Sequence, residues 1–104
     1  MLPPDAQYEE SAVAESREKV EEPPLFKVLL HNDDYTTMEF VVWVLESIFN
    51  MPEEQAIQVM LNVHLRGSGV AGVYTYEIAE TKVEKTTALA REHEYPLLVT
   101  MERE

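Results

Sequence analysis

Residues 28–48, VLLHNDDYTTMEFVVWVLESI, join two apolar runs that have different periods. The apolar residues at 28–30 are consecutive, as in a buried strand, whereas those from Met38 to Ile48 recur every three or four residues, as on one face of a helix. The stretch between them carries an amide, two acids and two hydroxyls, and Thr36 and Glu39 have the spacing of a capping box. The sequence therefore predicts a strand-to-helix turn whose polar side chains lie beside a helix N-terminus, where a cation would find partners.

The rest of the chain supplies enough elements for one small sheet covered by helices. Pro52 followed by two glutamates suits a helix start, and Thr81 with Glu84 repeats the capping-box spacing. The expected elements are strand 25–31, helix 37–49, helix 52–65, strand 70–79, helix 81–94 and strand 97–102. This order, βααβαβ, predicts an α/β fold of the α+β type, a three-stranded antiparallel sheet with three helices packed on one face.

The first part of the chain differs from the rest in composition. Residues 1–24 hold seven acids, two bases and four prolines, and their few apolar residues form no continuous face. Such a segment cannot bury enough surface to offset the entropy of ordering it. We therefore expect a disordered acidic N-terminal extension over 1–24, followed by a single domain over 25–104.

Composition excludes several classes of function. The formal net charge of −12 over 104 residues disfavours nucleic acid as a partner. The absence of cysteine excludes disulfides and thiolate metal sites, and no residue pattern suggests a metal or another cofactor. No apolar run has the length of a membrane span, and no signal peptide is evident. The sequence predicts a soluble cytoplasmic protein that does not act on membranes.

The polar residues taken alone leave two interpretations open. Met60, Val63 and His64 fall on one face of the expected second helix, where the histidine is either a ligand-binding group or an ordinary residue near the helix end. Asp33 and Asp34 are common turn formers as well as candidate ligands. No serine, lysine or cysteine is placed as a nucleophile, and adjacent acids rarely act on one bond from opposite sides, so we expect no enzyme.

Four motifs in order resemble one protein family. HNDDYTTMEFVVWVL, VMLNVH, GVYTYEIAETKVE and YPLLVTMER together are similar to the ClpS adaptors, from about Leu25 to Glu104. The resemblance implies an adaptor that binds N-degrons, meaning a free α-amino group with a bulky apolar N-terminal residue, and delivers substrates to a Clp AAA+ ATPase for proteolysis. It also implies two partners, the N-terminal domain of a ClpA- or ClpC-type ATPase working with ClpP, and peptides that begin with Phe, Tyr, Trp or Leu.

The same resemblance assigns roles residue by residue. The implied α-amino-binding residues are Asn32, Asp33 and His64. The implied hydrophobic pocket is lined by Asp34, Thr36, Met38, Val41, Met60, Val63 and Leu97. The implied ATPase-docking residues are Glu77, Glu80 and Lys82. Each has a simpler alternative, since the apolar residues also fit a core and the charged ones a solvated edge.

Three residues depart from the family pattern, and one alternative function remains. Thr37 stands where proline is usual, Trp43 where polar residues are frequent, and Ala71 where cysteine is frequent. None belongs to the implied amine-binding set, but a turn without proline is less rigid and can alter selectivity. The alternative is a module that docks on the ATPase only to inhibit or redirect the Clp protease, without N-degron binding.

Overall fold

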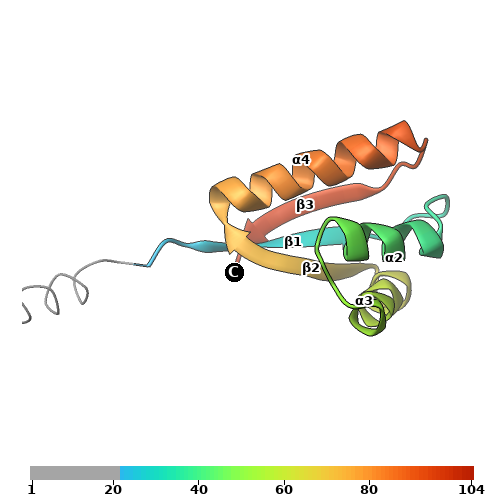
Figure 1. Ribbon diagram of the computed structural model, residues 1–104, viewed down its shortest axis with the longest axis horizontal. Helices are drawn as coiled ribbons and strands as arrows, with labels where there is room; N and C mark the ends of the chain where they lie inside the picture. Colours follow the sequence, from blue (N-terminus) through green and yellow to red (C-terminus); the bar gives the residue numbers. More distant parts are fainter. Residues whose placement is uncertain (1–21) are drawn as a thin grey trace, which may run out of the picture.

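The computed structural model describes residues 22–104 (Figure 1). Its elements are β1 (Leu25–His31), α2 (Met38–Ser47), α3 (Glu53–Arg66), β2 (Ser68–Thr75), α4 (Tyr76–Glu92) and β3 (Leu98–Arg103). This order confirms the predicted βααβαβ arrangement. We predicted disorder for residues 1–24, but residues 1–21 lie outside the described part of the chain. The first strand, β1, begins at Leu25.

The three strands form one antiparallel sheet in the order β2-β1-β3. β1 is central and pairs with both neighbours, so that His31 faces Ser68 of β2 on one side and Leu98 of β3 on the other. The register with β2 shifts between Val28 and Leu29. The polar turn therefore leaves the sheet from the end of its central strand, between β2 and β3.

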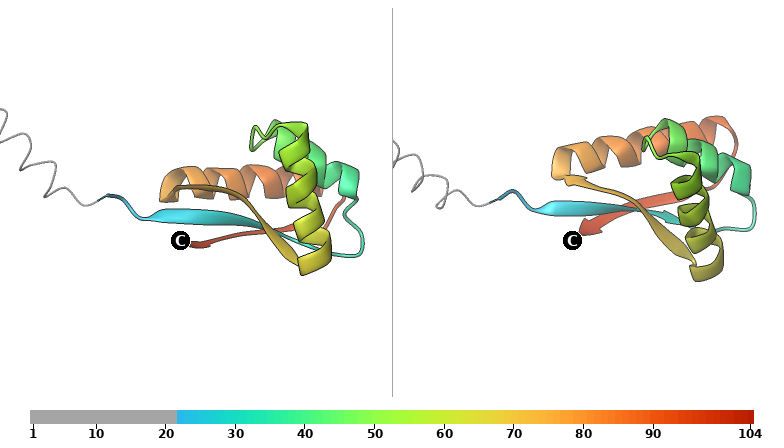
Figure 2. Two further views of the ribbon diagram at one scale, coloured as in Figure 1. Left: turned by 90° about the horizontal axis from the view of Figure 1, so that it is seen from below. Right: turned by 60° about the horizontal axis from the view of Figure 1, so that its bottom comes forward.

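The helices lie on one side of the sheet and enclose the core (Figure 2). α4 packs against all three strands, and α3 packs against α2 and β2. Val28 and Leu30 of β1 and Leu45 of α2 are fully buried. Residues 79 and 90 of α4 are buried alanines, whose small side chains let this helix approach the strands closely. No helix within residues 22–104 is long and apolar enough to cross a membrane.

The predicted boundary between the second strand and the last helix was wrong. We expected a strand over 70–79 and a helix from residue 81, but β2 ends at Thr75 and α4 begins at Tyr76. The alternation of apolar residues through Tyr76 and Ile78 is typical of a strand, yet both side chains are exposed here, and Ala79 is the buried residue. Thr81 lies inside α4, where its hydroxyl donates to the Glu77 carbonyl at 3.0 Å, so no capping box forms there.

The start of α2 differs from the prediction by one residue. The N-cap is Thr37, whose Oγ1 accepts from the Phe40 N–H at 3.2 Å, and the helix begins at Met38. The Thr36 hydroxyl lies outside the helix and donates to Asp33 Oδ2 at 2.7 Å. The hydroxyls of two neighbouring threonines thus have separate roles, one stabilising the turn and the other the helix.

Candidate functional site

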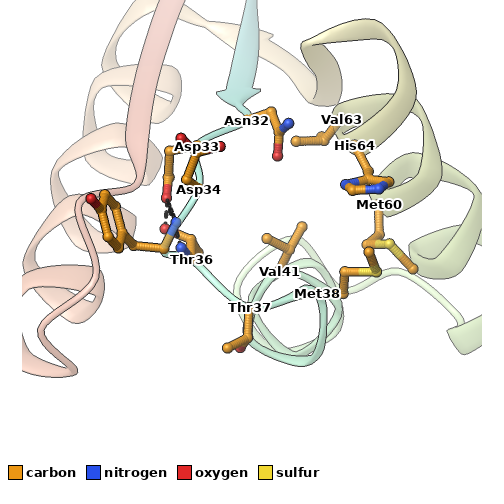
Figure 3. A pocket seen from close by; sticks show the side chains of 11 residues that line it. Asn32, Asp33, Asp34, Thr36, Thr37, Met38, Val41, Met60, Val63 and His64 are labelled. Carbon is orange, nitrogen blue, oxygen red and sulfur yellow. Dashed lines mark hydrogen bonds between the residues drawn. The ribbon is translucent and has the colours of Figure 1, made fainter.

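The turn between β1 and α2 is organised by the side chain of Asp33. Its Oδ1 accepts from the backbone N–H groups of Tyr35 at 2.8 Å and Thr36 at 2.6 Å, while Oδ2 accepts from the Thr36 hydroxyl. An aspartate that binds the backbone two and three residues ahead is a frequent way to close such a turn. These bonds fix residues 32–36 at the edge of a pocket (Figure 3).

The same hydrogen bonds keep Asp33 ionised. Partial burial raises the pKa of Asp33, but the bonds from Thr36 and Tyr35 and the positive charge of Arg91 outweigh it, so the net pKa is lowered from 3.8. Asp33 therefore carries a full negative charge at neutral pH.

The lowered pKa predicts a specific dependence of stability on pH. A carboxylate with a lowered pKa in the folded state contributes stability that is complete above its ordinary value of 3.8 and is lost as pH falls through the lowered pKa. Chemical denaturation at several pH values should therefore show that the Asp33→Asn variant loses less stability than the natural chain between about pH 5 and pH 2. Parallel losses in both proteins would contradict this role for the carboxylate.

The second side of the pocket comes from the C-terminal half of α3. α3 is followed by its C-cap, Gly67, which adopts the left-handed conformation with φ 92°, a conformation that glycine reaches without strain. The Gly67 carbonyl accepts from the Asn32 N–H at 2.9 Å. This bond joins the end of α3 to the end of β1, and it sets His64 across the pocket from the Asn32 amide (Figure 3).

The pocket encloses about 360 Å³. It is lined by Asn32, Asp33, Asp34, Tyr35, Thr36, Thr37, Met38, Val41, Met60, Val63 and His64. The structure thus brings together all three expected amine-binding residues and the expected pocket residues except Leu97. Leu97 is fully buried in the core and does not line this pocket. Tyr35 and Thr37 also line the pocket but were not among the expected residues. Their positions in the turn between expected lining residues could have indicated both.

The pocket has a polar wall and an apolar floor. Residues 32–37 supply an amide, two carboxylates and hydroxyls, whereas Val41 and Val63 are almost completely buried at 5% and 3% exposure. Met38 is 45% exposed at the pocket edge. Anionic and neutral oxygens beside an apolar floor suit a ligand with a cationic head and an apolar side chain.

The three residues implied in ATPase docking lie far from the pocket. All belong to the N-terminal half of α4, at the left of Figure 1, while the turn of residues 32–37 is at the right. Glu77 and Glu80 are exposed. Lys82 is partly buried, and its Nζ donates to the Ile48 carbonyl at the end of α2 at 2.5 Å. Lys82 therefore also has a structural contact within the domain.

Comparison with known proteins gives consistent matches. The family model described as ATP-dependent Clp protease adaptor protein ClpS matches residues 21–100. The chain is 52% identical to the ATP-dependent Clp protease adapter protein ClpS of Myxococcus xanthus, with 94% of each chain covered. It is 58% identical to the protein of that name from Hyphomonas neptunium, with 86% of this chain and 76% of the relative covered.

A solved structure extends the comparison to three dimensions. The fold is similar to that of Agrobacterium tumefaciens ClpS2 bound to L-phenylalaninamide, with a TM-score of 0.77 and 46% sequence identity. The match covers 80% of this chain and 100% of the other.

Proposed function

Because this chain belongs to the ClpS family of ATP-dependent Clp protease adaptor proteins, we propose that its pocket binds the N-terminal residue of substrate proteins and that the chain delivers them to a Clp ATPase. Membership of an adaptor family confirms the expectation that the protein is not an enzyme. The single observation that carries the binding proposal is the meeting of amine acceptors and an apolar floor in one pocket.

Three side chains are proposed to hold the α-amino group. The ammonium group has three N–H donors, and Asn32 Oδ1, the Asp33 carboxylate and a His64 ring nitrogen are three acceptors on the wall of the pocket. Charge-assisted hydrogen bonds of this kind are roughly twice as strong as neutral ones. The apolar side chain of the substrate's first residue would then lie over Val41 and Val63. Met38 and Met60 would flank it.

An affinity series over peptides that differ only at residue one tests this function. Peptides that begin with Phe, Tyr, Trp or Leu should bind, because each fills the apolar floor, and their affinities should lie within about 200-fold of one another because one methylene contributes about 1–3 kcal/mol. A peptide that begins with Gly or Ser should bind much more weakly. Equal affinities throughout the series would contradict the proposal and favour a module that only docks on the ATPase.

Met38 is proposed to exclude side chains that branch at Cβ. It is the first residue of α2, lies at the pocket edge and is only half-buried, so it can be shortened without opening the core. Met38→Ala should therefore admit peptides that begin with Ile or Val while keeping those with Phe or Leu. Competition binding measures this. Loss of the Phe and Leu peptides without gain of the branched ones would assign Met38 to the core.

Delivery is proposed to use the other end of the molecule. The partner would be the N-terminal domain of a ClpA- or ClpC-type ATPase acting with ClpP in the cytoplasm, and the contact would involve Glu77, Glu80 and Lys82. The two exposed glutamates lie at the start of α4, away from the pocket, so one adaptor can hold a substrate and an ATPase together (Figure 1).

This separation predicts that docking and peptide binding can be altered independently. Glu80→Lys should reduce degradation of an N-degron reporter by ATPase and protease severalfold, because it reverses an exposed charge on the proposed contact. Its affinity for a Phe-initiated peptide should equal that of the natural chain. Glu84→Lys, a change one turn further along the same helix, serves as a matched control. An undiminished degradation rate with Glu80→Lys would remove this residue from the docking surface.

A further inference from the structure

A second hollow, formed largely by aromatic side chains, adjoins the pocket at Thr37. This aromatic groove is lined by Thr37, Glu39, Phe40, Trp43, His93 and Tyr95 and encloses about 330 Å³. Thr37 belongs to both hollows. Its hydroxyl lies 3.4 Å from the hydroxyl of Tyr95, which places the loop after α4 beside the turn.

The rings of the groove pack around one buried phenylalanine. The Phe40 ring is 7% exposed, and its centroid lies 4.7 Å from that of Tyr95, 5.4 Å from His93 and 5.7 Å from Trp43. Trp43 and His93 also meet edge to face at 5.6 Å. The base is thus a fixed aromatic cluster, while the Trp43 indole keeps 44% exposure and presents a large apolar surface to solvent.

The proposed orientation of the substrate directs its chain toward this groove. With the ammonium group held by Asn32, Asp33 and His64, the peptide must leave the pocket over another edge. The side chains of Met38 and Met60 at one edge of the pocket offer no strong hydrogen-bond partner to the next N–H and C=O groups of the peptide. The edge at Thr37 offers a hydroxyl group, and Thr37 also lines the aromatic groove.

We propose that the aromatic groove is a second subsite that receives an aromatic or large apolar side chain from the second or third residue of the substrate. An extended chain advances about 3.3 Å per residue, with side chains alternating between its two sides, so one of these two residues faces the groove after crossing Thr37. The inference rests on the proposed function, because it takes the position of the first residue from it. It predicts that N-degron recognition extends beyond residue one.

Three peptides test the subsite in the full-length protein. Calorimetric titrations with Phe-Gly-Gly, Phe-Phe-Gly and Phe-Gly-Phe amides compare an empty groove with an aromatic side chain at residue two or three. We expect one of the last two to bind about tenfold more tightly than Phe-Gly-Gly, the usual gain from a well-placed aromatic contact. Trp43→Ala should remove this gain and leave the affinity for Phe-Gly-Gly unchanged. Tyr76→Ala, which shortens an exposed aromatic side chain at the far end of α4, should preserve both affinities.

A fluorescence measurement on the natural chain supports the test without a substitution. Trp43 is the only tryptophan in the sequence, and none of the three peptides contains one. At saturation the tighter peptide should change the emission of Trp43, whereas Phe-Gly-Gly should change it little.

The outcomes separate the subsite from the function on which it rests. Equal affinities of the three peptides, with unchanged Trp43 emission, would overturn the subsite alone. Failure of Phe-Gly-Gly to bind would overturn the proposed function and the subsite with it. If Trp43→Ala leaves the gain intact but reduces self-association in sedimentation experiments, the groove is an interface between copies of the chain, and the proposal is wrong.

Discussion

N-terminal acetylation of a Phe-initiated peptide is expected to abolish its binding to this chain. Acetylation removes the positive charge and two of the three N–H donors that Asn32, Asp33 and His64 are proposed to receive. It also adds a bulky group at the polar wall of the pocket. Each charge-assisted bond contributes about 1.5–3 kcal/mol, so the affinity should fall on the order of a thousandfold.

The control for acetylation is a change of equal size elsewhere on the peptide. Acetylating a lysine side chain several residues downstream also removes one positive charge, but it leaves the α-amino group free. That peptide should retain most of its affinity. If both acetylated peptides lose binding equally, the pocket senses total charge and not the α-amino group.

Replacement of Asp33 should produce the largest loss of affinity among single variants of the pocket. Asp33→Ala removes a negative charge from the polar wall and also the acceptor of three hydrogen bonds that fix the turn. The direct contact alone should cost about 1.5–3 kcal/mol of binding free energy, measured by calorimetry with a Phe-initiated peptide. His64→Ala should also weaken binding, but it leaves the turn intact.

Asp33→Asn distinguishes the two roles of this residue. The amide oxygen can still accept the backbone N–H bonds of Tyr35 and Thr36, so the turn persists, but the negative charge is gone. We expect this variant to lose affinity nearly as much as Asp33→Ala while the pocket keeps its shape. Full recovery of binding in Asp33→Asn would show that the carboxylate only organises the turn.

The elements that sequence predicted well are those with a clear period or a strong terminator. β1 has the predicted bounds, because its apolar run is short and two prolines precede it. The α4 start was misplaced because Tyr74, Tyr76 and Ile78 alternate like a strand, and only the packed structure shows that Ala79 is the buried residue. Local periodicity cannot distinguish an exposed aromatic residue on a helix from one on a sheet edge.

The site was predictable to the extent that its residues share one turn and one helix face. Asn32, Asp33 and His64 do meet at one pocket. What sequence did not reveal depends on tertiary contacts. Leu97 packs into the core instead of the pocket, and the bond from Asn32 to the Gly67 carbonyl, which fixes the distance between the two walls, joins segments 35 residues apart. Spacing along the chain does not encode such contacts.

A nuclear magnetic resonance titration with L-phenylalaninamide locates the binding site of a minimal ligand that has a free amine and an aromatic side chain. If the pocket binds the first residue of substrates, chemical shifts should change at residues 32–41 and 60–64, around the pocket, and remain unchanged at residues 76–82 of α4. Shift changes confined to residues 76–82, or no changes at saturating ligand, would contradict this role of the pocket.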